Sequence, residues 1–286
     1  MISRIPVTSA RSLPEAYALL EKPPPGLRVL AGGTDLMVQL QARVGLERIG
    51  HVLDIWGLRE LRFVDRAEGL LRLGALATYG DLRDSPLVRE RFPALAELSR
   101  EVGARAIQSR GTLGGNVCNA SPAGDTLPLL IAAGASFVVG GPRGERRIAA
   151  DQFFVAYRRT ALAPDELFLR AELPELAPHE RLVYRKVGTR RAQSISRTLL
   201  ALRGGALGGR LAGVRVAAGG VAPVPLRCRL AEAALEGRPV DALAVAAARA
   251  AIEGEIRPIS DLRGSADYRR EVTGNLLARL LPELAG

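Results

Sequence analysis

The N-terminal part of the chain alternates between short helical and short extended apolar patterns. Residues 12–21 have apolar positions at helical spacing after Ser12, which is a good N-cap, with a proline in the first turn and a glutamate three residues after the serine. Residues 27–31 form an apolar run typical of a strand, and residues 35–45 return to helical spacing. The pattern predicts helix, strand, glycine turn and helix.

The middle of the chain combines extended apolar runs with a longer helical stretch. Residues 78–102 have helical spacing, and Pro86 and Pro93 are expected to interrupt the helix because proline lacks the amide N–H that the helix needs. A glycine-rich stretch at 111–125 and an apolar segment at 127–140 follow. The other apolar runs predict strands at 51–58, 70–78 and 168–174.

A connection rich in proline and glutamate, residues 174–179, separates this region from a different pattern. Beyond it we expect two strands of an antiparallel sheet, at 183–190 and 213–221. Three helical segments are expected at 230–237, 241–254 and 268–284. We therefore predict an N-terminal domain at 1–174, in two parts at about 1–55 and 56–174, and a C-terminal domain at 175–286.

The composition supports a packed core and no membrane span. Of the 286 residues, 48% are hydrophobic, yet no apolar run approaches the roughly 20 residues that cross a bilayer. The first residues lack the apolar centre of a secretory signal. We expect a cytoplasmic protein without a transmembrane segment.

The cysteines and histidines are too few and too scattered for a metal site. Cys118 and Cys228 do not form a CxxC pair, and His51 and His179 lie far apart in the sequence. We expect no metal ligands in this chain, so that any metal centre that exchanges electrons with it belongs to another chain.

The net charge of +10 raises the question of nucleic-acid binding. The basic residues are spread along the chain and only 4% of residues are aromatic, so we expect no nucleic-acid partner. Lys22 and Lys186 are the only lysines, and every other basic residue is arginine. An arginine-rich solvated surface with a docking face for an acidic partner explains this composition.

Two glycine-rich segments carry the candidate chemistry. The first glycine segment, residues 31–36 (AGGTDL), lies between the predicted strand and helix, and the second, residues 112–116 (TLGGN), continues to Asp125. Glycines permit positive φ and close approach, and such turns direct unpaired backbone N–H groups at a phosphate. Neither segment has the GxGxxG or GxxxxGK[ST] spacing, so each segment alone is equally compatible with a structural turn.

The two segments and their surroundings resemble the flavoproteins of the molybdenum hydroxylase family. AGGTDL and TLGGNVCNASPAGDTLP are similar to the family's two FAD-binding signatures. The resemblance extends to residues 184–196, 214–237 and 259–281 and covers almost the whole chain. The carbon monoxide dehydrogenase type resembles this chain most. The resemblance implies an α+β fold: a two-lobed FAD-binding domain of the vanillyl-alcohol-oxidase/PCMH type, followed by a C-terminal domain with a small antiparallel sheet and helices.

The resemblance also implies a set of FAD contacts, and no catalytic acid, base or metal ligand in this chain. It places Asp125 in a hydrogen bond to FAD, Val102 on the adenine side, and Phe168 and Lys186 against the cofactor. The full implied set is Val29, Leu30, Ala31, Gly32, Gly33, Thr34, Asp35, Leu36, Val102, Thr112, Leu113, Gly114, Gly115, Asn116, Asp125, Phe168 and Lys186.

Several of these residues have a structural alternative. Asp125 is also positioned to cap the apolar segment after it, and Val102 and Phe168 also suit a hydrophobic core. Lys186 stands out in a chain that otherwise uses arginine, which indicates a need for a compact ammonium group near the flavin. Cys118 is expected to be a small buried residue rather than a redox thiol.

The resemblance implies an electron-transfer role within a larger assembly. A large partner subunit would hold the molybdenum cofactor and oxidise the substrate. A small partner would carry two two-iron two-sulfur clusters, and this chain would pass electrons through FAD to an external acceptor, NAD or quinone. The implied assembly is a dimer of heterotrimers. Two alternatives remain: a stand-alone flavin oxidase, and a non-catalytic assembly module whose flavin site has decayed.

Overall fold

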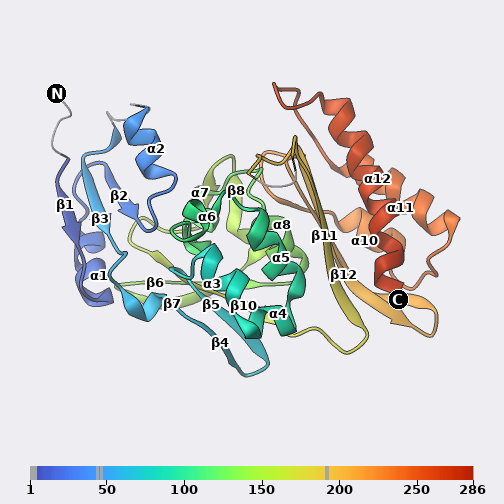
Figure 1. The fold of residues 1–286 in the computed structure, drawn as a ribbon, viewed down its shortest axis with the longest axis horizontal. Coiled ribbons are helices and arrows are strands. Elements are labelled where there is room, and N and C mark those ends of the chain that lie inside the picture. Colours follow the sequence, from blue (N-terminus) through green and yellow to red (C-terminus); the bar gives the residue numbers. More distant parts are fainter. Residues whose placement is uncertain (1–4, 43–44, 46–47, 191–192, 286) are drawn as a thin grey trace.

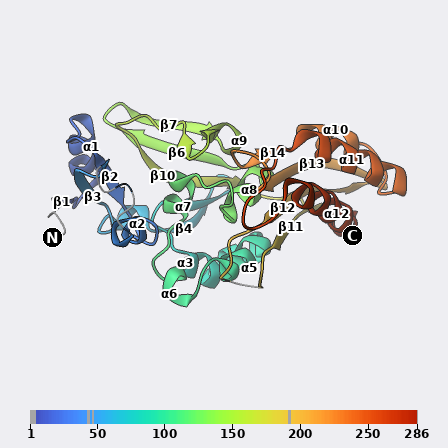
Figure 2. The same cartoon turned by 90° about the horizontal axis from the view of Figure 1, so that it is seen from above.

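The protein is built from three main sheets that follow one another along its long axis. A computed structural model describes residues 5–42, 45, 48–190 and 193–285. The three-stranded and four-stranded sheets lie at opposite ends of the molecule, and the five-stranded sheet lies between them (Figure 1). The view from above shows the same order, with the C-terminal helices at the far end (Figure 2).

The N-terminal sheet is parallel, with the strand order β1-β3-β2. Ser12 begins α1 by accepting the Glu15 amide, as its sequence pattern predicts. The predicted strand at 51–58 stops at Asp54, and the helix predicted for 35–45 is six residues long, with positions 43–44 outside the described residues. The elements are β1 (Val7–Ser9), α1 (Leu13–Glu21), β2 (Leu27–Leu30), α2 (Leu36–Gln41) and β3 (His51–Asp54).

The central sheet has the order β4-β5-β10-β6-β7, and neighbouring strands are antiparallel. β10 is the strand predicted at 168–174, whereas β7 was not predicted because its residues are mostly exposed and polar. A 3-10 turn at Arg59–Leu61 precedes the sheet. The strands are β4 (Val64–Ala67), β5 (Leu70–Gly74), β6 (Ser136–Gly141), β7 (Gly144–Ala149) and β10 (Leu167–Pro174).

The helical stretch predicted at 78–102 divides at its prolines into three helices. Pro86 and Pro93 each occupy the first turn of a new helix, and Thr78 opens the series with a capping box to Asp81. The helices of this region are α3 (Tyr79–Asp84), α4 (Pro86–Arg91), α5 (Pro93–Glu101), α6 (Arg105–Gln108), α7 (Leu113–Asn119), α8 (Thr126–Ala132) and α9 (Ala150–Phe153). The hairpin of β8 (Phe154–Ala156) and β9 (Arg159–Thr160) completes it.

The C-terminal sheet is antiparallel in the order β11-β12-β13-β14, and α10, α11 and α12 form a helical layer on its outer side (Figure 1). The helices and the antiparallel sheet agree with the prediction, but β12 was not predicted. The elements are β11 (Glu180–Val187), β12 (Thr198–Leu207), β13 (Arg210–Gly219), β14 (Leu226–Arg227), α10 (Arg229–Leu235), α11 (Ala242–Glu255) and α12 (Ala266–Ala285).

Two hydrophobic cores meet at β12. Leu199 and Ala201 belong to the core shared with the N-terminal half, and Leu200 and Leu202 belong to the core under the C-terminal helices. Successive side chains of a strand point to opposite faces, so both faces of β12 are buried. That arrangement removes the alternation of polar and apolar residues by which a strand is predicted. Within the described residues, no helix is long and apolar enough to span a bilayer.

Candidate functional site

The first glycine segment forms an open turn between β2 and α2. Gly33 has φ +81°, and a side chain at Gly32 would overlap the carbonyl oxygen of Arg110. The amides of residues 32–35 donate to no acceptor among the described residues, and the Asp35 carboxylate does not cap α2. Consecutive free N–H groups of this kind form a concave anion site. Because α2 has six residues, fewer than two turns, the loop amides, rather than a helix dipole, supply this property.

The second glycine segment differs from the prediction because its amides are already used. Leu113 N donates to the Ala77 carbonyl at 2.9 Å, and Gly114 N donates to the Ala75 carbonyl at 2.9 Å. The Gly115 and Asn116 amides donate to the side chain and carbonyl of Thr112 at 3.0 and 3.1 Å. This segment therefore offers no free amides at 113–116 to a phosphate.

Gly114 instead allows close packing beneath the site. A Cβ atom there would lie 2.7 Å from the Ala75 carbonyl oxygen and 3.0 Å from Phe168 Cδ1. Phe168 is 3% exposed and forms edge-to-face contacts with Phe137 and Phe153. The second segment thus lets α7 approach β5 and β10, and Ala75 just after β5 and Phe168 of β10 line the site.

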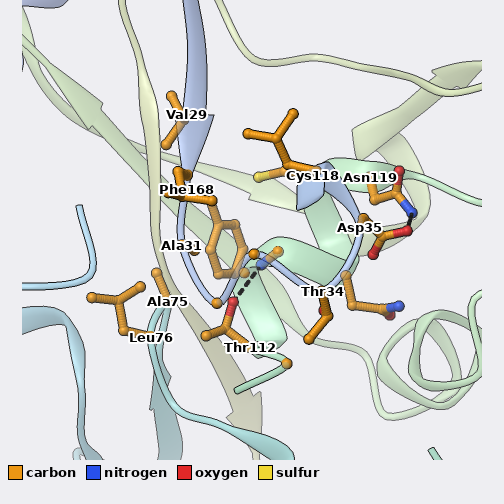
Figure 3. A pocket seen from close by; sticks show the side chains of 18 of the residues that line it. Val29, Ala31, Thr34, Asp35, Ala75, Leu76, Thr112, Cys118, Asn119 and Phe168 are labelled. Atoms are coloured by element: carbon orange, nitrogen blue, oxygen red, sulfur yellow. Dashed lines mark hydrogen bonds between the residues drawn. The ribbon is translucent and has the colours of Figure 1, made fainter. Parts of the chain in front are cut away.

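A cavity of about 520 Å³ lies between the two segments (Figure 3). Figure 3 shows Thr34 and Asp35 on one side of it and Ala75, Leu76 and Phe168 on the other. Most of the predicted contacts line this first cavity; Leu113, which is fully buried in the core, does not, and neither do Asp125 and Lys186. The predicted residues that line it are Val29, Leu30, Ala31, Gly32, Gly33, Thr34, Asp35, Leu36, Val102, Thr112, Gly114, Gly115, Asn116 and Phe168.

A second cavity, of about 790 Å³, adjoins the first and extends to the C-terminal half of the chain. Asp125 and the loop residues Gln193–Ile195 line it, together with Arg257, Ile259 and Asp261. The two cavities share part of their lining, so the site is elongated. The shared residues are Asp35, Val102, Ile107, Asn116, Asn119 and Arg158.

Asp125 and Lys186 form a buried ion pair beside the second cavity. Lys186 Nζ lies 2.6 Å from Asp125 Oδ2, and their side chains are 3% and 12% exposed. Ser196 Oγ donates to the other carboxylate oxygen of Asp125 at 2.6 Å. Asp125 does not cap α8 with its side chain, so the structural alternative for this residue is wrong. The pair instead joins the end of the glycine-rich stretch to β11 and the loop after it.

Glu101 and Tyr184 form a second polar contact near Lys186. Tyr184 Oη donates to Glu101 Oε1 at 3.0 Å. Burial raises the pKa of the Glu101 carboxyl, although the tyrosine hydrogen bond and the charge of Lys186 oppose that shift. Burial and the neighbouring carboxylate raise the pKa of Tyr184, so its phenol stays protonated at neutral pH.

Asn116 and Tyr79, two polar residues that line the first cavity, contact Thr126 through hydrogen bonds that the sequence did not predict. Thr126 Oγ1 donates to Asn116 Oδ1 at 2.7 Å, and Tyr79 Oη lies 3.5 Å from the same threonine oxygen. The carbonyl of the Asn116 side chain therefore faces Thr126. Within the described part of the chain its amide Nδ2 has no acceptor, which leaves a donor for a ligand.

Cys118 differs from its prediction. It lines the first cavity and is exposed, not buried. Although the residue as a whole is exposed at the cavity wall, the protein atoms around its sulfur raise the pKa of the thiol. The expectation that Cys118 is not a redox thiol stays a prediction.

Trp56 and Arg110 support the first glycine segment and were not predicted. The Arg110 guanidinium lies 3.8 Å from the centre of the Trp56 ring, and Arg110 Nε donates to the Gly32 carbonyl at 3.3 Å. Arg110 lies two residues before the second glycine segment, and Trp56 is the single tryptophan of the chain. The contact ties the two glycine-bearing loops together.

The residues fit an elongated ligand with an anionic centre. The free amides of residues 32–35 suit a diphosphate, and glycines keep the backbone open there. The apolar residues Val102, Ile107 and Phe168 suit the faces of aromatic rings. A dinucleotide combines these features.

Comparison with known proteins identifies the family. The model for the FAD binding domain in molybdopterin dehydrogenase matches residues 3–176, and that for the CO dehydrogenase flavoprotein C-terminal domain matches residues 183–284. This chain belongs to the FAD-binding medium subunits of the molybdenum hydroxylase family. Members of this family are oxidoreductase subunits that bind FAD, as the resemblance implied.

Individual relatives cover nearly the whole chain. The carbon monoxide dehydrogenase medium chain of Hydrogenophaga pseudoflava is 32% identical over 271 residues, which are 95% of this chain and 93% of the relative. The glyceraldehyde dehydrogenase medium chain of Sulfolobus acidocaldarius is 32% identical over 276 residues, 96% of each chain.

The fold agrees with solved structures of the family. A chain of carbon monoxide dehydrogenase from Hydrogenophaga pseudoflava superposes with a TM-score of 0.94 at 32% identity, over 98% of this chain and 97% of that one. The predicted α+β fold, with an FAD-binding domain followed by a C-terminal domain, is confirmed.

Proposed function

We propose that this chain is the flavin-carrying electron-transfer subunit of a molybdenum hydroxylase. Bound FAD supplies both one-electron and two-electron redox chemistry. The observation that carries the proposal is the pair of adjoining cavities, which together run from the free amides of residues 32–35 to the loop at 193–195. The names of its relatives, medium chains of dehydrogenases, support a role beside other subunits.

The first cavity is proposed to hold the diphosphate and the second to hold the flavin end. The amides of residues 32–35 and the Thr34 hydroxyl would donate to phosphate oxygens. Asn116 Nδ2 would donate at the junction of the cavities, and Val102 and Phe168 would contact rings. Gly114 and Gly115 would act by keeping space rather than by donating hydrogen bonds.

Lys186 is proposed to tune the flavin, although Asp125 already balances its charge in the present arrangement. A positive group near the flavin favours the anionic reduced form and raises the reduction potential. Lys186→Met is expected to lower the reduction potential of bound FAD and to weaken FAD binding. An unchanged potential together with unchanged affinity would remove this role.

The proposed partners are a large molybdenum-cofactor subunit and a small subunit with two two-iron two-sulfur clusters. They are expected to assemble as a dimer of heterotrimers, with NAD or quinone as the external acceptor. The relatives named as medium chains support such partners. This assembly is tested by purifying the chain together with the products of the neighbouring genes and measuring the size of the complex.

We further propose that the chain divides after Pro174 into domains at 1–174 and 175–286, and that the first divides near residue 55. β10 ends at Pro174 and β11 begins at Glu180, which supports a connection between them. Limited proteolysis is expected to cut first within residues 175–179.

The absorption spectrum of the purified chain tests the flavin proposal against its alternatives. Oxidised-flavin bands whose FAD is released by acid support the electron-transfer subunit. A covalently held flavin would support the stand-alone oxidase. A colourless protein that takes up no added FAD would support the decayed assembly module.

A further inference from the structure

Arg158 occupies an unusual backbone position next to the two cavities. Ala156 pairs with Arg159 across the β8–β9 hairpin, so Tyr157 and Arg158 form its two-residue turn. Arg158 has φ +51°, a left-handed conformation that glycine and asparagine adopt readily and that a long side chain adopts at a cost. A strained residue beside a ligand site points to a role for its side chain.

The Arg158 side chain is linked to the first glycine segment through Asn119. Arg158 Nη1 donates to Asn119 Oδ1 at 2.9 Å, and Asn119 Nδ2 donates to Asp35 Oδ1 at 3.1 Å. Figure 3 shows the contact between Asn119 and Asp35 at the edge of the cavity. All three residues line both cavities, so the linked series lies where the cavities join.

The remaining donors of Arg158 are available to a ligand. Its Nε and Nη2 have no acceptor among the described residues. The planar guanidinium is therefore oriented by one hydrogen bond and keeps further N–H groups that match phosphate oxygens.

A diphosphate at the free amides would be stabilised by a cation that offsets the carboxylates of the first cavity. The ionised groups that line it are Arg28, Asp35, Arg158 and Glu166. Glu166 is paired with Arg146, but the Asp35 carboxylate lies two residues after Gly33 and would repel a diphosphate. Arg158 is linked to Asp35 through the hydrogen bonds of Asn119.

We propose that Arg158 clamps the diphosphate of FAD: Asp35 and Asn119 orient its guanidinium, which adds positive charge to the open amide turn beside that of Arg110 at the Gly32 carbonyl. The proposal rests on the placement of the diphosphate at residues 32–35. It assigns a new function to the β8–β9 hairpin, and it explains why a strained turn carries arginine where glycine would be relaxed.

The test is FAD titration of the full chain carrying Arg158→Gly, at low and at high salt. Glycine relieves the backbone strain, so the thermal stability without FAD is expected to be unchanged or higher. The FAD dissociation constant is expected to rise roughly tenfold to hundredfold at low salt, the effect of losing one charge-assisted contact. At high salt the FAD dissociation constants of the variant and of the unaltered chain are expected to become more similar, because salt screens the charge of Arg158.

Three further variants distinguish the loss of the Arg158 charge from an effect on folding. Glu68 has φ +53° in the β4–β5 turn, away from the cavity lining, so Glu68→Gly relieves comparable strain and is expected to leave FAD binding unchanged. Asn119→Ala is expected to weaken FAD binding less than Arg158→Gly, because it removes the orientation of the guanidinium but not its charge. Arg158→Lys is expected to restore part of the affinity.

Two results would overturn the clamp. One is an unchanged FAD affinity in Arg158→Gly, and the other is a loss of affinity that salt does not alter. Gly33→Ala, which strains the amide turn itself, distinguishes the clamp from the site beneath it. If Gly33→Ala loses FAD binding and Arg158→Gly keeps it, the clamp is rejected and the diphosphate site is kept. If both variants bind FAD with full affinity, the diphosphate site is rejected as well.

Discussion

The two glycine segments look alike in sequence and have different roles in the structure. In the first, the amides of residues 32–35 have no acceptor among the described residues and open into a cavity. In the second, the amides of residues 113–116 are all used, by Ala75, Ala77 and Thr112. One segment is therefore suited to binding an anion, and the other brings a helix against two strands.

The difference shows that glycine content indicates close approach without saying what approaches. At Gly114 the close neighbours are Ala75 and Phe168, which are protein atoms. At Gly33 a Cβ atom would lie 3.3 Å or more from its nearest neighbours, which are apolar side-chain atoms, and the backbone N–H groups of residues 32–35 donate to no acceptor among the described residues. Whether each backbone N–H donates to a protein acceptor or stays free, rather than the glycine motif, distinguishes a binding segment from a packing segment.

Gly32→Ala is expected to have the largest effect, because Gly32 is where the two loops touch. A methyl group there overlaps the Arg110 carbonyl, so the backbones must separate. We expect the free energy of unfolding to fall by about 3 kcal/mol or more, with loss of FAD binding. Gly57→Ala, where the nearest atom is 3.7 Å away, is the control for chemical denaturation; equal stability of the two variants would contradict the contact.

Gly114→Ala is expected to lower stability even without FAD. The added methyl lies within 3.0 Å of Ala75 and Phe168, which typically costs about 1–3 kcal/mol. Gly254 lies inside α11 with nothing within 4 Å, so Gly254→Ala is expected to stabilise the protein instead. If Gly114→Ala lost FAD affinity at full stability, the second segment would be a binding element.

Thr112→Val removes the N-cap of α7. Its hydroxyl accepts the Gly115 amide, and loss of such a cap costs about 1 kcal/mol. Thermal denaturation without FAD is expected to show this loss, while FAD affinity changes little once folding is accounted for. Unchanged stability together with weaker FAD binding would show that the Thr112 hydroxyl contacts the ligand.

Thr34→Val is the matching change in the first segment and is expected to have the smallest effect on stability. The Thr34 side chain has no hydrogen-bond partner within the described residues and lines the first cavity. We expect unchanged stability and an FAD dissociation constant raised about threefold to tenfold, as for one neutral hydrogen bond. A stability loss as large as that of Thr112→Val would mean that the two segments do not differ.

The local features of the fold were predictable from the sequence. Ser12 caps α1, and Pro86 and Pro93 begin new helices, because caps and proline act through neighbouring residues alone. Both glycine segments line the first cavity, and their glycine content was visible in the sequence although their meeting depends on the assembled fold. β12 was not predictable, since burial of both its faces removes the alternating pattern.

The parts of the site that were missed depend on residues far apart in the chain. The amides of Leu113 and Gly114 donate to the carbonyls of Ala77 and Ala75, a pairing that only the assembled sheet creates. Lys186 was recognised as unusual, but its pairing with Asp125 depends on packing between the two halves of the chain. Arg158 has no motif of its own, and its role depends on the backbone conformation of the hairpin.

Amide hydrogen exchange at the two glycine segments, with and without FAD, tests the central claim most directly. We predict fast exchange at residues 32–35 in the free protein and slow exchange at 113–116, because only the second set is hydrogen-bonded. Added FAD is predicted to slow exchange at 32–35 by more than its effect at 113–116. Slow exchange at 32–35 before FAD is added, or new protection confined to 113–116, would contradict the account.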